Sequence, residues 1–556
     1  MLKKSKFLRR LLRVLAVIVL LFGLLFAYLV WVSDIPEPKI KDTAALQLQR
    51  QQPDSGLYTI GNNWFRKSNS GLYELYIKGA PFERGVINGK LSKELVQLQE
   101  DYFSEQINRM VPSNFYRHFL KYFIGWFNRK LPDYVADEYK DEIFGISRSA
   151  SDNYGYIGDK YQRILNYHSA HDIGHALQNL ALVGCTSFGT WGTASADSTM
   201  IIGRNFDFYV GDDFAKNKIV EFVNPSAGYK FMSVTWGGFI GVVSGMNEKG
   251  LTVTINAAKS SVPSGAATPV SLVAREVIQY AKNIDEAIAI ARKRKMFVSE
   301  SFLVGSAADN KAVIIEKTPD SLAVYDPRKN SILCTNHFQS NAFWNSKPNK
   351  EMREKSSSVY RYNRLNQLLS ENGKNSVQKT INILRDFRGM NNADIGLGNE
   401  KAVNQFIAHH SIVFEPQKLL VWVSTAPWQL GPYVCYDLKK IFSLQGLSKN
   451  IEVNESALTI PADSFIYTPA FKRFEQFRAL RARVQNGEQI NPDSLVADNP
   501  TFYNSYILAG DYCFKNRLYS KAAQFYQKAL TLEIANHGER EHAEKMLKKA
   551  REKTAG

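Results

Sequence analysis

Cys185, Arg204 and Asp207 have the residue types and the spacing of a thiol nucleophile with charged support. A cysteine attacks carbonyl carbon as its thiolate and needs a base close by. A cysteine at a chain terminus carries its own base, because the reference pKa of an α-amine is about 7.7–8.0. In this chain the amine is held in the Gly184–Cys185 peptide bond, so this chemistry requires that the bond be cut first.

The residue before the cysteine suits a self-cleavage at this bond. Glycine lacks a side chain and tolerates a strained backbone. The thiol of Cys185 can attack the carbonyl of Gly184 to give a thioester, which water then hydrolyses. The sequence therefore predicts processing at Gly184 and Cys185, with fragments 1–184 and 185–556 held together without a covalent bond. The simpler alternative is that Cys185 is a buried structural thiol.

Arg204 and Asp207 lie in the run IIGRNFDF, which predicts a second strand returning from the cysteine. In such a hairpin both side chains can face the new N-terminus. Asp207 would then hold the free amine, and Arg204 would lower the pKa of the thiol and bind negative charge. The alternative is a surface salt bridge beside a turn.

Three further polar residues follow along the chain. Asn256, in LTVTINAA, and Asn336, in ILCTNHF, each stand at the end of a predicted strand. Amides in such places can donate hydrogen bonds to a developing oxyanion, although capping of a turn is the ordinary use of asparagine there. Arg361, in SSSVYRYNR, either anchors an anionic substrate, braces the thiol or is simply solvated.

The predicted secondary structure that positions these residues changes from mainly helix to mainly strand at Thr186. Before it, helices are expected over 91–110 and over most of 134–182. After it, short β-rich runs are separated by Gly, Asn and Asp, at 186–191, 199–203, 217–223, 230–235, 239–244, 251–256, 301–305, 311–316, 321–325, 331–335, 411–416 and 418–425. Helical patterns occupy 269–282, 284–293 and 350–390. Strand runs interrupted by paired helices predict antiparallel sheet packed with helices.

The N-terminus predicts a membrane anchor. Val14 to Val32 is an uncharged run of 19 residues, which nearly spans a hydrocarbon core of ~30 Å. Six basic residues and no acid precede it, so the N-terminus should stay cytoplasmic and the catalytic body should lie outside the cytoplasm. A cleaved signal peptide is the alternative, although its apolar region is usually about 7–15 residues long.

Two other segments leave alternatives open. Residues 117–131, RHFLKYFIGWFNRKL, interleave aromatic and basic side chains. This suits a helix at a membrane interface or a core-facing helix with snorkelling basic residues. Residues 506–529 fit one tetratricopeptide-like hairpin, and because a single unit cannot bury its own face, it should pack on the catalytic domain or bind a partner.

Composition excludes some function classes. The net charge of +17 is partly concentrated before residue 14 and comes with no recognition motif, so nucleic acid is not an expected partner. Four cysteines in 556 residues form no disulfide framework. His168, His171 and His175 share one helical face with Asp172 nearby, which offers a zinc site as an alternative to ordinary helix packing.

At this point the motifs resemble a known group of enzymes. They are GAPFERGVING (79–89), GRNFDF (203–208), GMNEKGL (245–251), TNHF (335–338) and SSVYRYNR (357–364). The stretch from Cys185 to about Thr425 resembles N-terminal-nucleophile cysteine hydrolases, in particular the acyl-CoA:6-aminopenicillanic acid acyltransferase family and, more distantly, choloylglycine hydrolases. The resemblance implies an oxyanion role for Asn256, a second asparagine site at Asn336 and a distal arginine at Arg361.

The resemblance also implies the fold, an α+β protein with a four-layer αββα sandwich. The expected organisation is a signal anchor at 1–33, a mainly helical precursor segment at 34–184 and the αββα catalytic domain at 185–445. An extension at 446–500 and the tetratricopeptide-like helical hairpin at 501–556 complete the chain. The membrane anchor and the hairpin lie outside the family core, so substrate identity does not transfer.

The expected function is a self-processing amidohydrolase or acyltransferase that acts on a linear, non-peptide C–N amide through a thioester on Cys185. No cofactor is expected. The substrate would carry an apolar acyl chain and an anionic, lipid-like head group bound by Arg204 and Arg361. An apolar pocket would be lined by Phe188, Trp191, Phe206 and Phe208, which are equally suited to a sheet core. The rival functions are a membrane-anchored scaffold with an inactive hydrolase core and a zinc hydrolase centred on the histidine helix.

Overall fold

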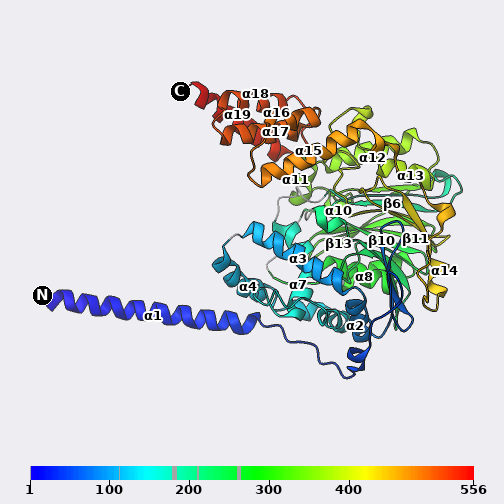
Figure 1. The fold of residues 1–556 in the computed structure, drawn as a ribbon, viewed down its shortest axis with the longest axis horizontal. Helices are drawn as coiled ribbons and strands as arrows, with labels where there is room; N and C mark the ends of the chain where they lie inside the picture. The colour runs from blue at the N-terminus through cyan, green and yellow to red at the C-terminus, as the bar shows by residue number, and fades with distance from the viewer. Residues whose placement is uncertain (1, 112, 178–183, 209–211, 260–264, 556) are drawn as a thin grey trace.

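Two β-sheets with helices packed around them form the body of the protein, and one long helix projects from it (Figure 1). The computed structural model describes residues 2–111, 113–177, 184–208, 212–259 and 265–555. The N-terminus lies at the far end of the projecting helix α1, and the C-terminus lies at a separate group of helices on the body (Figure 1).

The large sheet has 11 strands in the order β1-β2-β3-β4-β7-β8-β9-β10-β11-β12-β13. Its strands are β1 (Gln51–Asp54), β2 (Leu57–Ile60), β3 (Asn63–Lys67), β4 (Tyr73–Gly79), β7 (Ile219–Pro225), β8 (Phe231–Thr235), β9 (Ser244–Asn247), β10 (Leu251–Ala257), β11 (Glu300–Ser306), β12 (Lys311–Lys317) and β13 (Leu322–Tyr325). Neighbouring strands are antiparallel except β4 and β7, which pair in parallel over seven residues from Tyr73 opposite Ile219. The chain before Cys185 is therefore part of the large sheet.

The small sheet has six strands in the order β14-β5-β6-β15-β16-β17. They are β5 (Thr186–Thr190), β6 (Ile201–Phe206), β14 (Ser331–Cys334), β15 (His410–Glu415), β16 (Leu420–Ser424) and β17 (Tyr433–Asp437). The hairpin predicted to follow the cysteine is confirmed, because β5 and β6 pair antiparallel with Ser187 opposite Arg204.

Three apolar cores account for the stacking. One lies between the sheets and joins residues such as Phe222 of the large sheet to Phe414 of the small sheet. A second joins the other face of the large sheet to α8 and α9, and a third joins the small sheet to α12 and α13. The helices after Cys185 are α8 (Val270–Tyr280), α9 (Ile284–Lys293), α10 (Asn341–Trp344), α11 (Lys347–Lys355), α12 (Ser358–Glu371), α13 (Val377–Leu384) and α14 (Leu438–Ser443).

The segment before Cys185 is mainly helical, but it also contributes four strands to the large sheet. Its helices are α1 (Leu2–Ser33), α2 (Pro81–Leu91), α3 (Lys93–Met110), α4 (Asn114–Asn128), α5 (Leu131–Tyr134), α6 (Asp137–Ser147) and α7 (Lys160–Leu177). Residues 51–79, however, form the four strands β1 to β4. Helices α2 and α6 pack in close contact, because a Cβ at Gly85 would lie 2.0 Å from the Glu142 carbonyl oxygen.

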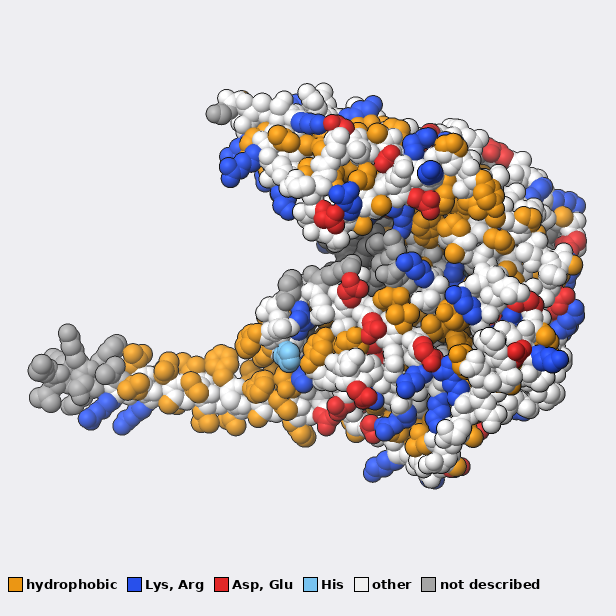
Figure 2. Space-filling model, viewed as in Figure 1, with side chains coloured by type: hydrophobic (Ala, Val, Ile, Leu, Met, Phe, Trp, Pro, Cys, Tyr) orange, Lys and Arg blue, Asp and Glu red, His pale blue; other side chains and the backbone are white. Residues whose placement is uncertain are grey.

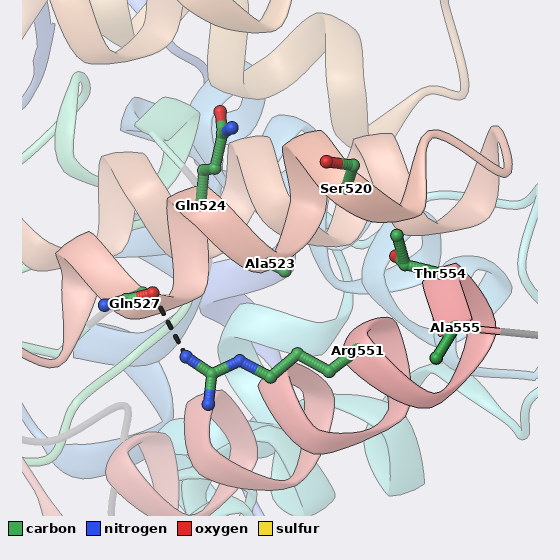
Figure 3. Close-up of a pocket in the computed structure, with 7 residues that line it drawn as sticks. All are labelled: Ser520, Ala523, Gln524, Gln527, Arg551, Thr554 and Ala555. Carbon is green, nitrogen blue, oxygen red and sulfur yellow. Dashed lines mark hydrogen bonds between the residues drawn. The ribbon is translucent and has the colours of Figure 1, made fainter.

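The C-terminal helices pack on the body that holds the two sheets. They are α15 (Pro469–Gln485), α16 (Pro492–Asp498), α17 (Tyr503–Lys515), α18 (Tyr519–Ala529) and α19 (His537–Ala555). Their apolar core includes Phe406 and Leu430 of the catalytic part, so the hairpin buries its face on this chain. A shallow pocket between α18 and α19 is lined by Ser520, Ala523, Gln524, Gln527, Arg551, Thr554 and Ala555 (Figure 3). None of these residues lies on an element that carries a predicted site residue.

One predicted strand is wrong. Residues 239–243 form no strand, and β9 begins only at Ser244. The Ile240 amide donates to His168 Nε2, and the Val242 amide donates to the Ser271 carbonyl. The Val243 carbonyl accepts from the Ile255 amide of β10, next to the start of β9. Much of this buried apolar run is therefore held by helices α7 and α8, and its β-branched composition gave no sign of that.

Candidate active site

The cysteine lies directly before β5 and inside the protein. Cys185 is only 1% exposed, and its Sγ lies 3.5 Å from Nη2 of Arg204. Burial raises the pKa of the Cys185 thiol, and the charge of Arg204 opposes that rise. The hairpin register thus brings together the two residues that the sequence singled out.

Arg204 is fixed by the strands of the large sheet. Its Nη1 donates to the Val243 carbonyl at 2.6 Å and to the Ser244 hydroxyl, and its Nη2 donates to the Ile255 carbonyl at 2.5 Å. Its guanidinium also lies 4.4 Å from the centre of the Phe206 ring. Burial lowers the pKa of Arg204. These contacts hold one edge of the guanidinium against the sulfur.

Asp207 is a buried carboxyl at the junction with unused hydrogen-bonding capacity. Its side chain is fully buried, and no described residue donates a hydrogen bond to either carboxyl oxygen. Burial raises the pKa of Asp207 to about 7, against the opposing charges of Arg361 and Arg204. The backbone carbonyl of Asp207 accepts a hydrogen bond from the Gly184 amide at 3.0 Å. The Asp207 carboxyl can therefore accept hydrogen bonds from a further donor at the Gly184–Cys185 junction.

The raised pKa of Asp207 predicts a pH-dependent stability. Between its unfolded value of 3.8 and its folded value of about 7, the folded state binds a proton that the unfolded state has released, so stability falls as pH rises. In an uncut Cys185→Ala background, adding Asp207→Asn should therefore stabilise the protein at pH 8 by about 2–4 kcal/mol. The gain should vanish near pH 4.

Thermal unfolding of the two uncut proteins across this pH range checks the expectation. Asp326→Asn serves as the control, because Asp326 is an exposed surface carboxyl whose pKa is lowered by the Arg328 backbone amide. Its variant should lose rather than gain stability at pH 8. A stabilisation by Asp207→Asn that does not change with pH would mean that the Asp207 carboxyl is not perturbed as described.

Arg361 braces the backbone of the nucleophile. From α12, its Nη1 donates to the carbonyl of Cys185 at 2.7 Å and its Nη2 donates to Asn336 Oδ1 at 2.7 Å. Its Nε donates to the Glu400 carbonyl at 3.1 Å. Arg361 is therefore neither solvated nor open to a substrate anion, and burial lowers its pKa to about 10.

The two asparagines lie in the same hydrogen-bonded group. Asn336 Nδ2 donates to the Ala257 carbonyl at 3.0 Å. Asn256 Oδ1 accepts from the Ser187 hydroxyl at 2.5 Å, and its Nδ2 donates to the Cys334 carbonyl at 3.1 Å. All six predicted site residues are thus buried within one region of the two sheets. Neither asparagine caps a turn.

Two interpretations from the sequence need correction. Arg204 and Asp207 are completely buried, so they are not a surface salt bridge. Most N–H groups of Arg204 and Arg361 are also taken up inside the protein, so the two arginines give no support to an anionic head group.

The four aromatic residues expected around the thiol separate into two groups. Phe188 lies in the core between the small sheet and α12 and α13, and Trp191 lies between the sheets. Phe206 and Phe208 stack at 5.8 Å in the same core as Cys185. That core also contains Phe214, Trp236 and Phe239. Two of the four residues thus share a core with Cys185 and two do not, and a substrate pocket lined by Phe206 and Phe208 stays a prediction.

A buried hydrogen-bond chain behind Arg204 was not predicted. His410 Nε2 and the Ser244 hydroxyl lie 2.8 Å apart, and Ser244 in turn accepts from Arg204. His409 and His410 share a contact of 3.0 Å between their Nδ1 atoms. Burial lowers the pKa of both imidazoles, so they are neutral groups that support Arg204. The sequence offered only an isolated His-His pair before a strand.

Gln405 is the second residue that the sequence did not single out. Its Nε2 donates to the carbonyl oxygen of Gly184 at 2.7 Å, and its side chain is 2% exposed. A lone glutamine between Asn404 and Phe406 carries no recognisable signal. Only the folded chain places it on the carbonyl of the Gly184–Cys185 peptide bond.

The histidine helix does not offer His168 to a metal. His168 Nε2 accepts from the Ile240 amide at 3.0 Å, and Nδ1 contacts the Ile164 carbonyl at 2.8 Å, so both ring nitrogens are used. Burial lowers the pKa of His168 to about 4. The side chains of His171 and His175 lie outside the described residues. Among the described residues, no group of three or more His, Cys, Asp or Glu has the arrangement of a metal site.

Comparisons with known proteins show which family part of this chain is similar to. Residues 194–426 match the model of the family described as acyl-coenzyme A:6-aminopenicillanic acid acyl-transferase. An uncharacterized protein of Archaeoglobus fulgidus is 26% identical over 274 residues, which cover 46% of this chain and 45% of that protein. Protein dcd1B of Dictyostelium discoideum is 22% identical over 45% of this chain and 51% of its own length. The chain thus spans about half the length of the curated relatives it matches.

Solved structures show more distant similarity. A Caenorhabditis elegans orthologue of N-acylethanolamine-hydrolyzing acid amidase is 18% identical, with a TM-score of 0.31 over 42% of this chain and 93% of that chain. A mutant conjugated bile acid hydrolase from Clostridium perfringens is 12% identical, with a TM-score of 0.33 over 46% of this chain and 93% of that chain. The family match confirms the resemblance carried by the sequence motifs: residues 194–426 of this chain are similar to the acyl-coenzyme A:6-aminopenicillanic acid acyl-transferases.

Proposed function

We propose that this protein is a self-processing cysteine amidohydrolase or acyltransferase built on an αββα sandwich. The observation that carries the proposal is the carboxyl of Asp207, buried without a hydrogen-bond donor at the Gly184–Cys185 junction. An enzyme whose nucleophile is an N-terminal cysteine has a use for that group, because the freed amine becomes its partner. A thiol with a guanidinium 3.5 Å away supports the same conclusion.

In the proposed cycle, the free amine of Cys185 takes the proton of its own thiol, and Asp207 holds the resulting ammonium. The thiolate attacks the carbonyl carbon of the substrate amide, with Arg204 stabilising its charge. Asn256 donates to the oxyanion of the tetrahedral intermediate. The ammonium returns its proton to the leaving amine as the C–N bond breaks. Water or a second amine then attacks the thioester, which releases the acyl group and restores the thiol.

The substrate we propose is a linear amide with an apolar acyl chain. Phe206 and Phe208 lie in the core that contains Cys185, and Phe214 and Trp236 extend the aromatic surface with ring centres 4.9 Å apart. Aromatic side chains of this kind suit an acyl chain better than a polar peptide. We leave the head group open, because the contacts of Arg204 and Arg361 are internal.

A substrate panel tests this proposal. N-acyl amino acids, N-acyl amines, bile conjugates, penicillins and peptides should be compared, with Cys185→Ala as the blank. Thiol-dependent release of an amine from one or more linear amides is the expected result. Cleavage confined to internal peptide bonds would contradict the amide proposal.

The scaffold alternative has less support. The C-terminal helices share their apolar core with Phe406 and Leu430 of the catalytic part, so the face that a partner would need is covered by this chain. Lys401 pairs with Glu533, and Asn399 Nδ2 donates to the Glu533 carbonyl at 2.8 Å. The helical unit is therefore better explained as a brace for the catalytic domain.

We further propose that α1 anchors the protein in a membrane with α4 lying at the interface. Arg9 to Ser33 form an apolar helical stretch of 25 residues, and its 18-residue apolar window has no buried residue. Helix α4 packs beside its end: the rings of Phe26 and Tyr122 lie 5.2 Å apart, and Gly125 contacts Ser33. Phe115 is 84% exposed on α4. In Figure 2 the hydrophobic surface continues from α1 onto the adjoining body.

Cell fractionation tests the anchor. The full chain should sediment with membranes and resist extraction by high salt, because an apolar helix is held by burial in the bilayer and not by charge. Protease added from outside should reach the catalytic body. A chain beginning at residue 34 is the control and should be released by salt or be soluble. Release of the full chain by salt alone, or a mature N-terminus beyond residue 33, would contradict a retained anchor.

A further inference from the structure

The carbonyl of Gly184 already has a hydrogen-bond donor before any reaction takes place. Gln405 Nε2 lies 2.7 Å from Gly184 O, and the pair is completely enclosed. Two other donors of the site bond to different carbonyls. Asn256 donates to the Cys334 carbonyl, and Arg361 donates to the Cys185 carbonyl. The donor on the scissile carbonyl is thus distinct from the one proposed for substrate turnover.

We propose that Gln405 is the oxyanion donor of the self-cleavage step, an inference that rests on the proposed self-processing. The Cys185 sulfur bonds to the Gly184 carbonyl carbon, and the carbonyl electron pair moves onto the oxygen that Gln405 already contacts. When the C–N bond breaks, the thiol proton goes to the Cys185 nitrogen, which leaves a thioester and a free amine. Water then adds to the thioester and returns the thiol, with Gly184 as a carboxylate. A donor in place before the charge develops stabilises it without reorganisation.

The glycine at position 184 has a second purpose in this arrangement. A Cβ there would lie 2.3 Å from Oε1 and 2.4 Å from Nε2 of Gln405. Real Cβ atoms do not approach other atoms so closely, so any larger residue would displace the amide from the carbonyl. Glycine is therefore required for the contact as well as for backbone freedom.

The loop that carries Gln405 is held on both sides. Asn205 Nδ2 donates to the Val403 carbonyl at 3.0 Å, and the Asn404 amide donates to the Asp386 carbonyl at 2.8 Å. On the other side, Arg478 Nη1 of α15 donates to the Phe406 carbonyl at 2.8 Å. The Phe406 ring also lies 4.8 Å from that of Phe474. The C-terminal helices thus fix the residue next to Gln405, which gives the unit a direct connection to processing.

The test is the rate of self-cleavage in the full-length chain, followed by gel and by mass spectrometry of the junction. Gln405→Leu keeps the size of the side chain and removes the donor, and it should slow the cut by about 10²–10³-fold, the usual loss for one oxyanion donor. Gln429→Leu is the matched control, because Gln429 is also fully buried and its Nε2 donates to the Leu384 carbonyl. Gln429→Leu should cut within about threefold of the wild-type rate. Thermal unfolding of both variants confirms that each is folded.

Two additions separate the chemical role from a packing role. Gly184→Ala should slow the cut, but Gly184→Ala with Gln405→Ala should be no slower than Gln405→Ala alone, because both changes remove the same contact. Hydroxylamine, which cleaves thioesters, should not rescue Gln405→Leu, because the slowed step precedes the thioester. A wild-type chain that never cuts would overturn the self-processing proposal itself. A folded Gln405→Leu protein that cuts at the wild-type rate, or a fully additive double variant, would overturn only the role of Gln405.

Discussion

Cys185→Ala should stop both the cut at residue 184 and all turnover of substrate. Alanine removes the sulfur that attacks the Gly184 carbonyl, and without the cut the amine that would act as the base stays in a peptide bond. The side chain is buried 3.5 Å from the Arg204 guanidinium, and no other described thiol has such a neighbour in hydrogen-bonding distance. We expect a single uncut chain on a denaturing gel and no activity above that of a reaction without enzyme.

Cys435→Ala is the control for Cys185→Ala. Cys435 is also a buried, unpaired thiol, but it lies in β17 in the core between the small sheet and α12 and α13. Its variant should lose some stability and keep both processing and turnover. Cys185→Ser should cut slowly, because a hydroxyl is the poorer nucleophile near neutral pH. Normal processing of a folded Cys185→Ala protein would show that the nucleophile is a different residue.

Asn256→Ala should lower kcat by about 10²–10³-fold, the usual cost of losing one oxyanion donor. Asn256 lies near the end of β10 beside Ser187, two residues after Cys185, and the Cys334 carbonyl accepts from its Nδ2. We expect the second N–H group to donate to the substrate oxyanion. The measurement is kcat and KM with the best substrate of the panel, on the processed form of each protein.

Asn256→Asp and Asn224→Ala complete that experiment. Asn256→Asp keeps the shape but removes the donors, so it should be as slow as Asn256→Ala. Asn224 lies in β7 of the same sheet and donates to the Tyr76 hydroxyl at 3.3 Å, so Asn224→Ala should retain near-normal kcat. Unchanged kcat in processed Asn256→Ala would refute the oxyanion role.

Local sequence signals predicted the part of the site that depends on one hairpin. The β5–β6 turn needs only strand pattern and register to bring Cys185 next to Arg204, and the structure has this register. Most strands after Thr186 were likewise visible, because alternating and β-branched runs bounded by Gly, Asn and Asp mark such strands well. The expectation of sheet packed with helices follows from the same signals and is confirmed.

Features that depend on contacts between distant segments were not predictable. Strands β1 to β4 are short and lie among polar residues, so the sequence does not show how they pair. Their pairing becomes favourable because β4 adds to β7, which lies more than 140 residues later in the chain. Gln405 reaches the junction from the loop before β15, and nothing in its local sequence separates it from a solvated glutamine. Arg361 was assigned to the site by resemblance, but the contacts that it makes from α12 could not be predicted from its own segment.

The sheet topology also bears on the fate of the two fragments. β4 lies before the proposed cut and β7 lies after it, and they pair over seven residues inside the large sheet. Arg84 and Glu142, which both precede the proposed cut, form a buried ion pair. Glu142 also accepts a hydrogen bond at 3.2 Å from Arg275 of α8, which follows the proposed cut. Separation of the fragments would therefore expose hydrogen-bonding groups and an ion pair that are now buried. The fragments should remain one folded unit after processing.

The most direct test of the whole account is the mass and the N-terminal sequence of the purified wild-type protein. We expect two non-covalently associated fragments, one ending at Gly184 and one beginning with a free Cys185. Activity should rise in proportion to the processed fraction. An intact chain of 556 residues that hydrolyses amides at full rate, with no fragment beginning at Cys185, would contradict the central claim that the nucleophile is an N-terminal cysteine released by the protein itself.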